Sequence, residues 1–241
     1  MHGYYRVATA VPVLKLADPA ANAIAVSRMV QDAADAEAAL VVFPELCLTG
    51  YTVADLFFQP TLQQAALDAL DTVRRSTTGH NMVVLVGLPL VHQSRLYNCA
   101  AVLQGGEIKG IVPKTYLPTY NEYYEKRWFT SGAECAFTSV PINGREIPFG
   151  TDLLFRVNDE CVIGVEICED FWVVVPPSSY QAQAGATLIA NLSASVALVA
   201  KDEYRQQLIV GQSGRCISGY IYASSGVHES TTDVVYGGHA L

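Results

Sequence analysis

The sequence predicts an α/β protein in which helices cover sheets of mixed strand direction. Segments with the apolar pattern of strands alternate along the chain with segments of helical spacing. Some successive strands are separated by a turn and others by a whole helix, so we expect both antiparallel and parallel pairs. Hydrophobic residues make up 51% of the 241 residues and charged residues 16%, without any repeat or linker. This composition is typical of one well-packed domain.

The chain opens with a strand, a helix and a second strand. Tyr5–Ala10 has the pattern of a strand. Asp18 followed by Pro19 predicts a helix start, because Asp caps helices and Pro is tolerated at the first helical position. The apolar residues that follow keep helical spacing to about Ala36. Ala39–Phe43 is a wholly apolar run, which indicates a buried strand.

A second helix and three strands are expected next. The helix follows Pro60 and has Leu62, Ala66, Leu70 and Val73 on one face. The strands are expected at Met82–Leu88, Tyr97–Leu103 and Ile108–Val112. Between the last two, Gln104-Gly105-Gly106-Glu107 has the composition of a two-residue hairpin turn.

The second half of the chain begins with an irregular segment and then returns to alternating strands and helices. From Pro113 to Phe149 the pattern breaks up, and a loop of this length inside a compact domain is usually functional. Strands are then expected at Leu153–Val157, Val162–Ile167, Thr187–Ala190 and Tyr220–Ala223. Helices are expected around Tyr180–Ala184 and at about Asp202–Ser218.

Charge and cysteine content argue against several classes of partner. A formal net charge of -8 disfavours nucleic acid or an anionic membrane surface as the main partner. The cysteines have uneven spacing without a C-x-x-C pair, so neither a zinc site nor a disulfide framework is expected. They are Cys47, Cys99, Cys135, Cys161, Cys168 and Cys216. The start of the sequence lacks a secretory pattern and the apolar runs are too short for a membrane span. We therefore expect a reduced, cytoplasmic enzyme without a metal.

Three polar residues come directly after predicted strands. Glu45 follows ALVVFP, Lys114 follows IKGIVP and Cys168 closes VIGVEIC. Strand ends are common positions for reactive side chains in α/β enzymes, because the sheet fixes them while the adjoining loops admit substrate. Each residue alone also fits an ordinary structural role, as a helix cap, a solvated charge or an inert buried thiol. Their joint occurrence favours catalysis.

The three residues make chemical sense as a unit. A cysteine thiol becomes a competent nucleophile beside a base or a positive field. Glu45 can accept the thiol proton and later return it to a leaving amine. Lys114 and the backbone N–H of Glu169 can stabilise the oxyanion of a tetrahedral intermediate. The chemistry requires no histidine, and none lies in these segments.

Three segments carry a resemblance to a known family. FPELCLTGY (43–51), PKTYLPTYNEYYEKRWF (113–129) and GVEICEDFW (164–172) resemble the signature segments of the nitrilase, or carbon–nitrogen hydrolase, superfamily. Within it, NLSAS (191–195), the pair Lys201 and Arg205, and SSGVHESTTDVVYGGHAL (224–241) are similar to glutaminase domains of glutamine-dependent NAD synthetases. The resemblance covers essentially the whole chain. It implies a single-domain αββα sandwich with Glu45, Lys114 and Cys168 as a catalytic triad.

The resemblance also implies supporting and binding residues. A further carboxylate beside the lysine is expected from Glu122 or Glu125, with a slight preference for Glu122. A glutamine pocket is expected from Tyr51, Tyr120, Glu169, Trp172 and Ser195, with Lys201 pairing with the α-carboxylate. His228 and Glu229 resemble an acid–base pair but have no nucleophile beside them, so we assign them to structural or interface roles.

The function implied is hydrolysis of L-glutamine through a cysteine thioester, which supplies ammonia for NAD⁺ synthesis from deamido-NAD⁺. A stand-alone amidase, nitrilase or carbamoylase would use the same triad and remains the alternative. A non-enzymatic assembly scaffold is a third reading. The sequence has no S-G-G-x-D-S loop, so ATP and Mg²⁺ are expected only in a separate synthetase domain. We expect the chain to lack that domain and its own last strands, and to form a homo-oligomer.

Overall fold

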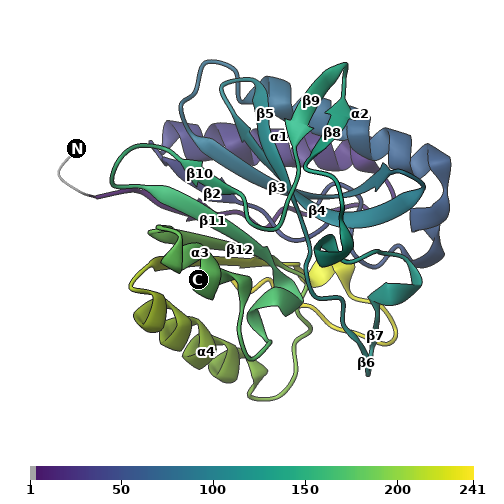
Figure 1. Cartoon of the computed structure of the whole chain (residues 1–241). Coiled ribbons are helices and arrows are strands. Elements are labelled where there is room, and N and C mark those ends of the chain that lie inside the picture. Colours follow the sequence, from purple (N-terminus) through teal and green to yellow (C-terminus); the bar gives the residue numbers. More distant parts are fainter. Residues whose placement is uncertain (1–3) are drawn as a thin grey trace.

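Two β-sheets pack face to face between two pairs of helices in the computed structural model, which describes residues 4–241 (Figure 1). The first sheet has the order β1-β2-β3-β4-β5 and the second the order β10-β11-β12-β13. The first comprises β1 (Val7–Thr9), β2 (Leu40–Val42), β3 (Val83–His92), β4 (Arg95–Gln104) and β5 (Glu107–Pro113). The second comprises β10 (Leu154–Arg156), β11 (Val162–Ile167), β12 (Leu188–Ser193) and β13 (Gly219–Ser224).

Both sheets are mixed, as the sequence predicted. In the first, β1, β2 and β3 are parallel, whereas β4 and β5 continue as antiparallel neighbours. In the second, β11, β12 and β13 are parallel and β10 pairs antiparallel with β11. Parallel pairs need crossover connections, which the helices provide.

Four helices form the outer layers. They are α1 (Pro19–Asp35), α2 (Pro60–Ser76), α3 (Pro177–Gln183) and α4 (Lys201–Cys216). Figure 1 shows α1 and α2 against the first sheet, and α4 below the second. The predicted cap of α1 is present, because Asp18 Oδ1 accepts a hydrogen bond from the backbone N–H of Ala21 at 3.1 Å.

The side chains of β2 point alternately to the two sides of the first sheet and so contribute to two separate parts of the core. Val41 belongs to the cluster packed under α1 and α2, whereas Leu40 and Val42 face the second sheet. Successive side chains of a strand point to opposite faces, so a wholly apolar strand fills both layers at once. The sandwich implied by the family resemblance is confirmed.

The irregular segment expected from Pro113 to Phe149 is more ordered than predicted. It contains the hairpins β6 (Thr119–Tyr120) with β7 (Tyr123–Tyr124), and β8 (Ser139–Ile142) with β9 (Arg145–Pro148). The second hairpin turns at Asn143-Gly144, with φ of 50° and 74°. Asn-Gly favours positive φ and is a strong hairpin signal that the sequence analysis missed. The 3₁₀ turns η2 (Glu125–Arg127) and η3 (Gly132–Glu134) lie between the hairpins.

Two further boundaries differ from prediction. β3 and β4 extend to a tight turn at Gln93-Ser94, where both residues have positive φ, so the strands are longer than expected. After β13, the turn η5 (Val227–Glu229) begins a segment that runs back toward the sheets, where Val196 bridges Tyr236 and Ala223 bridges Ala240. Within residues 4–241, no helix is both long and apolar enough to cross a bilayer.

Candidate active site

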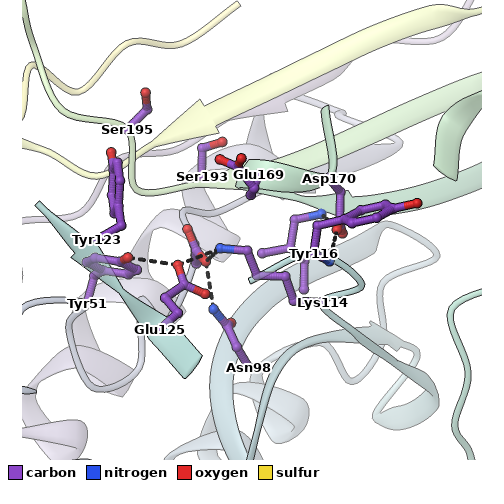
Figure 2. Close-up of polar contacts among 12 residues, drawn as sticks. Tyr51, Asn98, Lys114, Tyr116, Tyr123, Glu125, Glu169, Asp170, Ser193 and Ser195 are labelled. Atoms are coloured by element: carbon purple, nitrogen blue, oxygen red, sulfur yellow. Dashed lines mark hydrogen bonds and ion pairs between the residues drawn. The ribbon is translucent and has the colours of Figure 1, made fainter. Parts of the chain in front are cut away.

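Glu45 and Lys114 meet at one end of the sandwich, although they come from different strands. Glu45 follows β2 and Lys114 follows β5. Lys114 Nζ lies 2.6 Å from Glu45 Oε1 and 2.7 Å from Glu125 Oε1, and these side chains have no exposed surface. Figure 2 shows Lys114 reaching the carboxylate of Glu125. The site therefore has a buried cation between two anions.

One oxygen of Glu45 remains without a partner. Oε1 accepts from Asn98 Nδ2 at 2.6 Å as well as from Lys114. Oε2 is buried and has no hydrogen-bond partner in the described part of the chain. A free carboxylate oxygen is what a proton acceptor needs. Asn98 was not predicted as a site residue, although an amide among the buried, mostly apolar residues in the middle of β4 is a visible signal.

A glycine in β3 makes room for the turn that bears Glu45. A Cβ added at Gly87 would lie 2.2 Å from the backbone N of Leu46 and 2.8 Å from the carbonyl O of Pro44. Leu46 itself has a φ of 51°, which is unusual for a branched side chain. The Glu45 turn is thus pressed directly against the backbone of β3.

Glu125 contacts the lysine, and Glu122 does not. Glu125 begins η2, whose turn directs the carboxylate inward, and it also accepts from the Tyr51 hydroxyl at 2.8 Å. Burial raises the pKa of Glu125 to about 7 against the opposing charge of Lys114. Glu122 instead lines a cavity of about 360 Å³ that Tyr51, Tyr123 and other residues enclose. The slight preference for Glu122 is reversed, because the position of a turn in a loop cannot be derived from spacing alone.

Lys114 stays charged despite complete burial. Burial alone would lower its pKa, but the carboxylates of Glu125 and Glu45 outweigh that effect and raise the pKa well above its ordinary value. An opposite charge within hydrogen-bonding distance favours the ionised form.

Cys168 directly follows β11 and is the first residue of the 3₁₀ turn η4 (Cys168–Phe171). Its φ is 45°, in a region that residues with a side chain seldom occupy. Burial raises the pKa of its thiol well above the ordinary value, and the Glu45 charge raises it further, whereas the Lys114 charge lowers it. The raised pKa favours the protonated thiol at neutral pH.

Asp170, which was not predicted as a site residue, connects the turn that bears Cys168 to the loop that follows Lys114. Its carboxylate accepts from the backbone N–H of Ile167 at 2.9 Å, of Thr115 at 3.1 Å and of Tyr116 at 2.7 Å. Figure 2 shows Asp170 and Tyr116 beside Lys114. One buried side chain thus sets the position of both chain segments. It stands two residues after Cys168 within GVEICEDFW, but no spacing rule predicted these partners.

Four of the six residues expected to bind substrate lie together, and Tyr51 and Ser195 have other partners. Tyr120 donates its hydroxyl to Glu169 at 2.9 and 3.0 Å, and Lys201 Nζ lies 5.5 Å above the ring of Trp172. These four side chains form a mixed polar and aromatic group next to the cysteine turn. Tyr51 is buried, and its hydroxyl donates to Glu125.

Ser195 is held by Arg205 rather than left free. Arg205 Nη2 donates to Ser195 Oγ at 3.0 Å, and Arg205 is itself buried. Within residues 4–241, no group of three or more His, Cys, Asp or Glu side chains has an arrangement that could hold a metal ion.

Comparison with known proteins gives a family match over almost the whole chain. The model of the carbon–nitrogen hydrolase family matches residues 6–240. The glutamine-dependent NAD(+) synthetase of Mycobacterium tuberculosis is 43% identical over 242 residues, which cover 100% of this chain and 36% of the relative. The synthetase of the same name from Aquifex aeolicus is 31% identical and covers 80% of this chain and 31% of its own length. The chain thus spans about a third of the length of these relatives.

Solved structures agree with the fold. A glutamine-dependent NAD(+) synthetase from Cytophaga hutchinsonii superimposes with a TM-score of 0.85 at 30% identity, covering 98% of this chain and 38% of that one. An amidase from Nesterenkonia sp. superimposes with a TM-score of 0.78 at 16% identity, covering 100% of this chain and 83% of that one. The second likeness concerns the fold alone.

Proposed function

The chain belongs to the carbon–nitrogen hydrolase family, and from that premise we propose that it hydrolyses the side-chain amide of L-glutamine to glutamate and ammonia. The observation that supports this most is the buried Glu45–Lys114–Glu125 cluster whose charges act on the Cys168 thiol. The printed names of the relatives favour glutamine as the substrate.

In the first half of the proposed reaction, Cys168 is acylated. Because the thiol is protonated at rest, its proton passes to the free Oε2 of Glu45 as sulfur attacks the amide carbon. Lys114 and the backbone N–H of Glu169 stabilise the oxyanion. The C–N bond then breaks, and Glu45 returns the proton to the leaving ammonia. A γ-glutamyl thioester remains.

Water completes the cycle. Glu45 takes a proton from a water molecule that attacks the thioester carbon, and the C–S bond breaks. The sulfur regains the proton from Glu45, and glutamate leaves. The sum is one glutamine and one water converted to glutamate and ammonia. Lys114 keeps its charge throughout, which the pair of carboxylates around it favours.

Glutamine recognition is assigned to the group beside the cysteine turn. Glu169, with Tyr120 against it, can bind an α-ammonium group, and Lys201 can pair with an α-carboxylate. Trp172 and Tyr123, whose rings flank Lys201, can pack on the aliphatic stem. A simple amide has neither charge, so this arrangement favours an amino acid over the substrates of a stand-alone amidase.

We assign the ammonia to NAD⁺ synthesis from deamido-NAD⁺ by an ATP- and Mg²⁺-dependent synthetase domain. The support is that the named synthetases are about three times as long as this chain and match it over its full length.

A substrate comparison tests the proposal. The chain is incubated with L-glutamine, and separately with butyramide as an uncharged amide, while glutamate and ammonia are measured. A diazo-ketone analogue of glutamine should label Cys168, and Cys168→Ala should abolish ammonia release, whereas Cys161→Ala should retain it. Turnover of butyramide without turnover of glutamine would favour the stand-alone amidase. Labelling of another residue would exclude the assigned nucleophile.

A further inference from the structure

The C-terminal segment places a buried carboxylate behind the candidate active site. Glu229 lies at the end of η5 and is 1% exposed. Its Oε2 accepts from the backbone N–H groups of Tyr51 and Thr52, and its Oε1 accepts from the Ser225 hydroxyl at 3.0 Å. These donors are neutral, and burial raises the pKa of Glu229 to about 7, so the hydrogen bonds offset only part of the cost of burying the carboxylate.

The turn before Tyr51 is folded tightly around this carboxylate. Gly50 has a φ of 85°, and a Cβ added there would lie 3.4 Å from Glu229 Oε2 and 2.7 Å from Leu16 Cδ2. Thr52 Oγ1 also donates to the backbone carbonyl of Glu229 at 3.0 Å. Both the side chain and the backbone of Glu229 therefore fix the segment that bears Tyr51.

Tyr51 reaches the catalytic cluster from that segment. Its hydroxyl donates to Glu125 Oε1 at 2.8 Å, and Lys114 Nζ contacts the same oxygen at 2.7 Å. Figure 2 shows Glu125 between Tyr51 and Lys114, with both contacts as dashed lines. Because the tyrosine and the lysine share one oxygen, a displacement of Tyr51 changes the position of Glu125 relative to Lys114.

We propose that Glu229 is a positioning residue for the glutaminase reaction, which acts on the Lys114–Glu125 pair through Tyr51. The inference rests on the proposed function and extends it to a segment outside the three motifs. Glu229 touches none of the reacting groups. A purely structural role would stabilise the fold without any dependence on the Tyr51 hydroxyl, and this difference can be measured.

A double-mutant cycle separates the two roles. Tyr51→Phe removes only the hydroxyl, and Glu229→Ala removes the hydrogen bonds that the carboxylate accepts from the backbone of Tyr51 and Thr52. Each change should lower kcat by about 10- to 100-fold with little change in KM, because the catalytic groups are misplaced while the substrate contacts remain. In the Tyr51→Phe background, Glu229→Ala should lower kcat by less than about threefold further, because the hydrogen bond from Tyr51 to Glu125 is already lost.

Glu229→Gln is the matched control. Its amide oxygen can accept from both backbone N–H groups while its NH₂ donates to Ser225, so kcat should stay within about threefold of the wild type. If Glu229→Ala does not fold, Glu229→Asp replaces it in the cycle, since the shorter side chain cannot span the same contacts.

The rate of Cys168 alkylation across pH gives a second readout that needs no glutamine. Tyr51→Phe and Glu229→Ala should each raise the apparent thiol pKa, because Lys114 no longer lies where it lowers that pKa, and the double variant should show no further rise. A wild-type chain inactive on glutamine would overturn the proposed function but leave this alkylation test in place. Equal kcat losses from Glu229→Ala in both backgrounds, or an unshifted alkylation profile, would overturn the positioning role.

Discussion

At the scale of single residues, the site depends on opposing charges around one buried lysine. Lys114 contacts two carboxylates, and all three side chains are excluded from solvent. Removing one member of such a buried cluster leaves an uncompensated charge, which costs more than the intact interaction gains. The two kinds of charge have opposite effects on the Cys168 thiol, since Glu45 raises its pKa and Lys114 lowers it.

Substitution of Lys114 and of Glu45 should therefore move the thiol pKa in opposite directions. Lys114→Met removes a positive charge and should raise the apparent pKa of Cys168, whereas Glu45→Gln removes a negative charge and should lower it. Both should slow turnover, and Glu45→Gln should do so by about 10²–10⁴-fold because the proton acceptor is lost. The pH dependence of alkylation measures the pKa. Lys109→Met is the control, because that lysine pairs with Glu107 at the surface. An unchanged profile in Lys114→Met would show that the lysine does not act on the thiol.

Two glutamates in one loop give a matched comparison. Glu125→Gln should lower kcat by about 10-fold or more, since a charged hydrogen-bond partner of Lys114 is lost. Glu122→Gln should change kcat by less than about threefold, because the carboxylate from this loop that contacts the Lys114 ammonium is that of Glu125. Steady-state kinetics of both variants measure the difference. The reverse order of effects would restore Glu122 as the supporting carboxylate.

At the scale of elements, the strand ends are fixed by backbone contacts as much as by side chains. Asp170 connects the turn after β11 to the loop after β5 through three backbone N–H groups. Gly87 in β3 allows the turn after β2 to approach its backbone. The first sheet and the second sheet therefore meet at the candidate active site with little freedom to shift.

Gly87→Ala should disturb the Glu45 turn from a distance. The new methyl group would overlap the backbone of Pro44 to Leu46, so we expect destabilisation of about 1–3 kcal/mol together with reduced turnover. Gly211→Ala within α4 is the control, because nothing lies within 4 Å of the added carbon and helix propensity improves by about 0.5–1 kcal/mol. Urea denaturation gives the free energy of unfolding. Wild-type stability and activity in Gly87→Ala would mean that the turn tolerates the contact.

At the scale of the whole molecule, the chain corresponds to about a third of its named relatives. A glutaminase that ran without its partner reaction would waste glutamine. The loop that bears Glu125 includes the hairpin of β6 and β7, which Figure 1 shows at one edge of the molecule, so a neighbouring domain or subunit can contact it there.

We therefore expect the isolated chain to form an oligomer and to hydrolyse glutamine more slowly than it does when joined to a synthetase domain. Loss of order in the Lys114–Glu125 loop can cost on the order of 10²-fold in rate. Size-exclusion chromatography with light scattering, together with ammonia assays of both forms, measures this. A monomer with equal turnover would show that the site needs no neighbour.

The amino-acid sequence alone predicts the α/β class of this protein and the strand ends that carry the candidate catalytic residues. Apolar runs, the Asp18 cap and the alternation of strands with helices predict the fold, because burial and helix capping act over short stretches of chain. The segments that contain Glu45, Lys114 and Cys168 were recognised by their resemblance to the signature segments of the family.

Which side chains touch could be read only from the folded chain. Asn98, Asp170, Glu229 and the choice of Glu125 over Glu122 depend on contacts between segments far apart in sequence, such as Glu229 with the backbone of Tyr51. The spacing of apolar residues along the chain does not predict such a contact, because its position is set when two sheets and their connecting turns pack into one core.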